Sequence, residues 1–173
     1  MPYRSWSERR AKPRTYVGLW LRAGFLRQRE LRKELQVTLN GGKPGWNNDE
    51  PAVVEFACQI ALRRLFRGGC DASDIAGIVE VMREATGGDS PVDPLKAESM
   101  IRDALGEPDI DVKSIDPGQQ FRLRYLIAVT AISLLESDEA AIDEIITDSE
   151  RIAFERGWKP PIARDKSLRN LSE

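Results

Sequence analysis

The chain contains no histidine among its 173 residues. Histidine is the usual proton carrier near neutral pH and the commonest metal ligand in proteins. Its absence excludes Ser-His-Asp and Cys-His catalytic arrangements, and it excludes the Glu-x-x-His ligand pairs of di-iron bundles. An enzyme built on this sequence would have to use carboxylate, lysine, tyrosine or cysteine chemistry.

Cysteine and long apolar runs are also scarce. Cys58 and Cys70 are too few for a disulfide framework, and their spacing matches no zinc or redox motif. The longest uncharged apolar run, Tyr125–Leu135, has 11 residues, whereas a bilayer-spanning helix needs about 20. The first residues lack an apolar stretch of signal-peptide length. We therefore expect a soluble cytoplasmic protein with reduced thiols.

Three segments resemble functional motifs only in part. "NGGKPG" has Val37 where a phosphate-binding loop needs its first glycine, and Pro44 where the loop needs serine or threonine. "PDIDVKSIDP" is acidic, but Lys113 occupies a ligand-spaced position of a calcium loop. "ASDIAGIVEVMREA" starts like a helix-turn-helix and lacks the turn. We therefore expect no metal site, no cofactor and no catalytic residues.

The remaining pattern is helical throughout residues 49–158. Apolar residues recur at helical spacing between Gly- and Pro-rich breaks, and a capping residue precedes each helical segment. The expected caps are Asp49, Asp71, Asp93, Asp116 and Ser137, and Gly157 is the expected left-handed residue after the last helix. The sequence predicts an all-α, single-domain helical bundle of about five core helices plus a basic N-terminal helix.

Charge divides the chain more sharply than its net value of −2 suggests. Residues 1–46 carry a net charge of +8 and half of the aromatic residues, whereas residues 71–150 carry −13. We predict a basic, aromatic-rich segment at 1–46, an acidic helical core at 47–158 and a polar tail at 159–173. The basic segment should contain one helix over about 13–35, followed by a loop.

Within that basic helix, a helical projection separates two faces. Residues 15–21 also have strand-like composition, but the longer window favours a helix. Gly18 and Gly24 would each weaken it by up to about 1 kcal/mol. The apolar face would contain Val17, Trp20, Leu21, Gly24, Leu31 and Leu35. The opposite, basic face would contain Arg22, Arg29 and Lys33.

This basic face has several interpretations. With the flanking Arg9, Arg10 and Arg14 it could contact nucleic acid, an anionic membrane or an acidic protein. It could equally be a solvated helix face, or the acidic core could neutralise it within the molecule or across a homodimer. A pI near 5.4 argues against general nucleic-acid affinity.

Function is therefore expected from surfaces. The leading hypothesis is a non-enzymatic helical protein-binding module of regulatory, adaptor or toxin-neutralising type. An acidic face of Glu139, Asp143, Glu144 and Asp148 could engage a basic partner. The alternative is a nucleic-acid-binding protein that uses the basic N-terminal segment. A third hypothesis is a histidine-free enzyme that uses carboxylates or the two cysteines.

Overall fold

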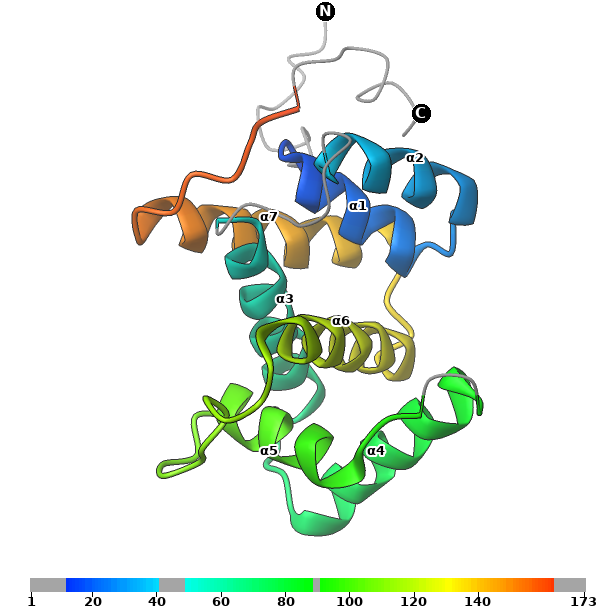
Figure 1. The fold of residues 1–173 in the computed structure, drawn as a ribbon, viewed down its shortest axis with the longest axis vertical. Helices are drawn as coiled ribbons and strands as arrows, with labels where there is room; N and C mark the ends of the chain where they lie inside the picture. Colours follow the sequence, from blue (N-terminus) through cyan, green and yellow to red (C-terminus); the bar gives the residue numbers. More distant parts are fainter. Residues whose placement is uncertain (1–11, 41–48, 89–90, 164–173) are drawn as a thin grey trace, which may run out of the picture. The chain divides into compact units, whose positions relative to one another are not determined.

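A computed structural model describes residues 12–40, 49–88 and 91–163 (Figure 1). These residues form seven helices and no β-strand, which confirms the predicted all-α fold. The helices are α1 (Tyr16–Phe25), α2 (Arg29–Asn40), α3 (Glu50–Leu65), α4 (Ala72–Thr86), α5 (Pro94–Ala104), α6 (Pro117–Leu134) and α7 (Glu139–Glu155).

Local sequence signals fix most helix starts. Asp71, Asp93 and Asp116 cap α4, α5 and α6 as predicted, because each side chain accepts hydrogen bonds from first-turn N–H groups. The cap of α7 is Asp138 rather than the predicted Ser137. The carboxylate of Asp49, the predicted cap of α3, accepts a hydrogen bond from the Lys159 N–H at 2.9 Å.

The N-terminal helix differs from the prediction, because it is broken into α1 and α2. Arg27 adopts a left-handed conformation with φ of 59°, and the Gln28 N–H donates to the Ala23 carbonyl at 2.8 Å. These bonds close α1 in the manner of a Schellman motif. The turn returns α2 along α1 (Figure 1), and Trp20 and Leu35 become buried. Burial of this apolar surface offsets the cost of a non-glycine left-handed residue.

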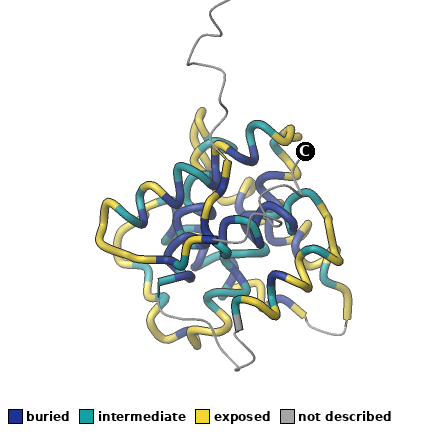
Figure 2. Tube along the Cα trace, turned by 90° about the horizontal axis from the view of Figure 1, so that it is seen from above, coloured by how far each residue is buried: buried dark blue, intermediate teal, exposed yellow. Residues whose placement is uncertain are grey.

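The helices group into two compact units. The first comprises Met1–Val53 and Ser137–Glu173, and the second comprises Val54–Glu136. The chain passes between the units within α3 and again just before α7. In the first unit α1 packs against both α2 and α7. In the second unit α4, α5 and α6 pack against one another. Buried and exposed positions alternate along the helices (Figure 2), as their amphipathic sequences require.

The described part of the predicted polar tail is ordered against α1. Gly157 has the predicted left-handed φ, at 88°. Beyond it, the Tyr16 N–H donates to the Pro161 carbonyl at 3.1 Å, and the Ala163 N–H donates to the Arg14 carbonyl at 2.8 Å. These bonds pair the start of α1 with residues 160–163, which belong to the predicted polar tail.

Candidate functional site

Arg22 is buried, so it does not belong to an exposed basic face. Only 4% of the surface of Arg22 is exposed to solvent. Its Nε atom donates to Asp143 Oδ1 at 2.6 Å, and its guanidinium also pairs with Glu139. The prediction that Arg22 shares a face with Arg29 and Lys33 is therefore wrong, because those two residues lie on α2, beyond the break. The interpretation in which acidic residues neutralise the basic segment internally holds for this arginine.

A second polar contact lies further along the same helix pair. The Glu150 carboxylate accepts hydrogen bonds from the Thr15 hydroxyl at 2.6 Å and from the Thr15 N–H at 2.8 Å. The Arg14 N–H adds a bond of 3.0 Å. Thr15 also caps α1, because its hydroxyl oxygen accepts from the Gly18 N–H at 2.9 Å. Burial raises the pKa of Glu150, although the hydrogen bonds oppose this rise.

Together these contacts form what we term the α1–α7 polar seam: Thr15, Gly18 and Arg22 at the N-cap and in the body of α1, with Glu150, Asp143 and Glu139 of α7. Successive positions on each helix are three, four or seven residues apart, so they share one face. They meet in opposite order, which places α1 antiparallel to α7. The burial of Glu150 was not predicted from the sequence, although Glu150 lies four residues after Ile146 and three before Ala153, both buried.

The predicted acidic face is consequently divided. Asp143 is buried in the seam and Glu139 contributes to it, although the Glu139 side chain remains 57% exposed. Glu144 is exposed. Asp148 is within 3.5 Å of Arg151 in an ion pair. The four carboxylates therefore do not form one continuous solvent-facing surface.

The other predicted basic residues have separate positions. Arg14 is exposed, and its guanidinium lies 4.9 Å from the centre of the Phe154 ring, a cation–π geometry. Arg29 and Lys33 are exposed on α2. Arg9 and Arg10 lie outside the described residues, as does "NGGKPG" beyond its first residue.

On α2 the solvent-facing side is defined by Arg29, Lys33 and Val37, which recur every fourth residue and which we call the α2 outer face. Val37 is 69% exposed, an unusual value for a valine on an ordered helix. The opposite side is covered, since Leu35 is 1% exposed. Lys33 pairs with Glu30 at 3.2 Å, but both side chains are largely exposed, so this pair contributes little to stability.

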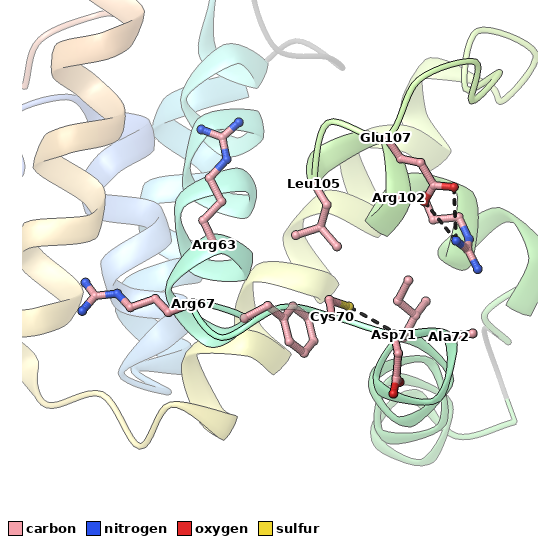
Figure 3. Close-up of a pocket in the computed structure, with 10 residues that line it drawn as sticks. Arg63, Arg67, Cys70, Asp71, Ala72, Arg102, Leu105 and Glu107 are labelled. Carbon is pink, nitrogen blue, oxygen red and sulfur yellow. Dashed lines mark hydrogen bonds and ion pairs between the residues drawn. The ribbon is translucent and has the colours of Figure 1, made fainter.

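The second unit contains a pocket of about 580 Å³ that no sequence motif indicated (Figure 3). It lies where α3 ends, α4 begins and α5 ends. Its lining residues are Arg63, Phe66, Arg67, Cys70, Asp71, Ala72, Ile75, Arg102, Leu105 and Glu107. Its volume falls within the range of about 300–1,000 Å³ found for small-molecule sites.

Both carboxylates of the pocket already have local partners. Asp71 Oδ1 accepts from the Asp74 N–H at 2.9 Å as the helix cap, and Glu107 Oε2 lies 2.9 Å from the Arg102 guanidinium. Arg63 and Arg67, by contrast, are exposed and make no ion pair with any residue of the described ranges. In Figure 3 their side chains extend away from the Arg102–Glu107 pair. The pocket therefore has one neutralised side and one cationic edge.

The two cysteines differ in exposure to solvent. Cys58 is buried, and burial raises its pKa to about 12, so its thiolate is scarce near neutral pH. Cys70 is exposed at the pocket, and its Sγ lies 3.6 Å from the Asp71 carbonyl oxygen. Partial burial, with Asp74 and Asp71 nearby, raises the pKa of Cys70. Neither environment activates a thiol nucleophile.

Within residues 12–40, 49–88 and 91–163, no cluster of three or more acidic or cysteine side chains could hold a metal ion. In the same ranges no helix combines the length and the apolarity that crossing a bilayer requires. The chain matches no protein-family model, no curated protein and no solved structure.

Proposed function

We propose that the protein is a non-enzymatic helical protein-binding module that docks an acidic partner protein on the α2 outer face. The observation that carries this proposal is the exposure of Val37, at 69%, in line with the exposed cations Arg29 and Lys33. Protein interfaces combine an apolar centre with charges at the rim, and this face offers both on one helix.

The α2 helix, which carries this face, is packed against another helix of the first unit. α2 packs on α1, and the Arg32 guanidinium lies 5.9 Å from the centre of the Trp20 ring. Trp20 itself is 5% exposed. A partner would therefore meet a surface whose backbone is already ordered, which lowers the entropic cost of binding.

The charge pattern favours a protein partner over a nucleic acid. Glu30 and Glu34 lie on the same helix among the cations, and Lys33 already pairs with Glu30. A phosphate backbone presents nearly continuous negative charge and would be repelled by these carboxylates. A folded partner can instead place separate carboxylates opposite Arg29 and Lys33, with an apolar side chain against Val37.

The test is affinity capture from the native cell with three forms of the full chain. These are the wild type, Arg29→Glu/Lys33→Glu, and the matched control Arg83→Glu/Lys113→Glu, whose targets are exposed residues of the second unit. Arg22 is left unchanged because its replacement would disturb the buried seam. Each partner lost only from the α2 variant is then purified and titrated against all three forms.

We expect the α2 variant to bind such a partner at least about tenfold more weakly, with the wild-type affinity falling as salt increases. The control should bind like the wild type, and far-UV circular dichroism should show equal helicity for all three forms. Unchanged capture by the α2 variant refutes the proposal. Wild-type binding to a single-stranded oligonucleotide at about 50 mM salt, abolished by the α2 variant, would favour the nucleic-acid alternative.

A further inference from the structure

We infer that the pocket of the second unit is a separate binding site for a small amphiphilic anion, an apolar body that carries one carboxylate group. This inference does not depend on the α2 outer face, because every residue that lines the pocket belongs to the second unit. It rests on the shape of the pocket, on its apolar lining and on the distribution of charge around it.

The apolar lining comes from three helical elements. Phe66 follows α3, Ile75 lies in the first turns of α4, and Leu105 follows α5. Ile75 is 4% exposed, whereas Phe66 and Leu105 are half-buried. A side chain that already contacts the core on one side can cover a ligand on the other. Burial of an apolar ligand group against these residues would supply most of the affinity.

The charge around this lining selects an anion. The carboxylates of Asp71 and Glu107 are used by the helix cap and by the Arg102 ion pair, so they leave little capacity to hold a ligand cation. Arg63 in α3 and Arg67 just after it both line the pocket, and neither has an ion-pair partner among the described residues. A ligand carboxylate at this edge would gain charge-assisted hydrogen bonds from guanidinium groups that no carboxylate of the described residues neutralises.

The geometry also limits how the anion is held. Figure 3 shows Arg63 and Arg67 extended away from the pocket, with Leu105 and Cys70 nearer its centre. Arginine stems are long and flexible, so the guanidinium groups can fold over a bound acid and form bidentate contacts. We therefore expect the apolar body to bind inside and the acid group to remain at the cationic edge.

The alkylation rate of Cys70, which lines the pocket, provides a direct measurement of ligand binding there. Iodoacetamide should alkylate Cys70 in the native protein and spare Cys58, which is buried and has a pKa near 12. The rate of Cys70 alkylation, followed by intact mass, is measured against increasing sodium octanoate. Octanamide and octylammonium serve as neutral and cationic probes of the same length. Acetyl-leucyl-leucine, with a free or an amidated carboxyl end, tests whether the acid can come from the end of a partner chain.

The expected result is that octanoate slows alkylation in a saturable manner and that octanamide and octylammonium do not. Protection by the free dipeptide and not by its amide would assign the same chemistry to a chain terminus. The variant Arg63→Gln/Arg67→Gln should weaken octanoate binding about tenfold. The control Arg83→Gln, on α4 and outside the pocket lining, should not change it.

Three outcomes would overturn this assignment. The first is equal protection by octanoate and octanamide, since charge would then play no part. The second is wild-type affinity in the double arginine variant. The third is the absence of protection by both carboxylate probes, provided that intact protein alkylated only at Cys70 is recovered.

Discussion

Replacement of Gly18 by alanine tests the α1–α7 polar seam most directly. At an ordinary interior position of a helix, glycine to alanine stabilises a protein by up to about 1 kcal/mol. At Gly18 an added Cβ would overlap Oε1 of Glu150 and would lie 2.9 Å from Oγ1 of Thr15. The carboxylate would have to move away from its donors.

The size of the effect follows from those donors. Glu150 accepts from the Thr15 hydroxyl, the Thr15 N–H and the Arg14 N–H. A hydrogen bond to a charged group contributes about 1.5–3 kcal/mol. Loss of two of them, less the gain of about 1 kcal/mol in helix propensity, predicts that Gly18→Ala is destabilised by about 2–5 kcal/mol.

The assay is urea unfolding followed by tryptophan fluorescence. Trp20, which is 5% exposed, and Trp158 both lie in the first unit, so their fluorescence reports on the unit that contains the seam. Gly77→Ala is the matched control, because Gly77 lies inside α4 and a Cβ there would meet nothing within 4 Å. Because Gly77 lies in the second unit, the control is followed by far-UV circular dichroism during urea unfolding. Its free energy of unfolding should rise by about 0.5–1 kcal/mol. A Gly18→Ala protein as stable as the wild type would refute this account of the seam.

Two further predictions concern the same seam. Arg22→Met should destabilise the first unit by about 3–5 kcal/mol in urea unfolding, because it leaves the buried Asp143 carboxylate without its ion pair. Arg151→Met, which breaks the exposed pairs with Asp148 and Glu155 on α7, should cost less than about 1 kcal/mol, and a cost equal to that of Arg22→Met would contradict the difference in burial. Burial raises the pKa of Glu150, so the folded state binds more protons than the unfolded state above pH 4.5, and the free energy of unfolding falls as pH rises toward the folded-state pKa. Glu150→Gln should flatten this dependence in unfolding measured at several pH values, and an unchanged slope would assign it to other groups.

Much of the fold was predictable because its signals are local. The sequence "DASD" specifies the reciprocal cap of α4, and each Asp-Pro pair fixes both a cap and the first helical residue of α5 or α6. Apolar spacing identified the helices themselves. The break after α1 was not predictable in this way, because Arg27 is a non-glycine residue in a conformation that usually requires glycine.

The candidate sites were predicted less well, since they depend on contacts between distant segments. The α2 outer face contains two of the three residues assigned to the basic face. The pocket was not predicted at all, because it requires the ends of α3 and α5 to meet the start of α4. A helical projection places residues on a face, but it cannot say which face another helix will cover.

The sequence by itself determined the all-α class, most helix starts and the uneven distribution of charge along the chain. It did not predict that Ser137–Glu173 would group with Met1–Val53 in one compact unit. Only the tertiary structure decided which charged side chains form buried ion pairs and which glycine is required by close packing. Arg22 lies 121 residues from Asp143 in the chain, yet their side chains form a buried ion pair. Gly18, which lowers helix propensity when considered alone, is the position where only a glycine leaves room for Glu150. Both results have the same physical reason. Burial and close contacts depend on residues that are distant in the sequence, and local sequence patterns do not identify those residues.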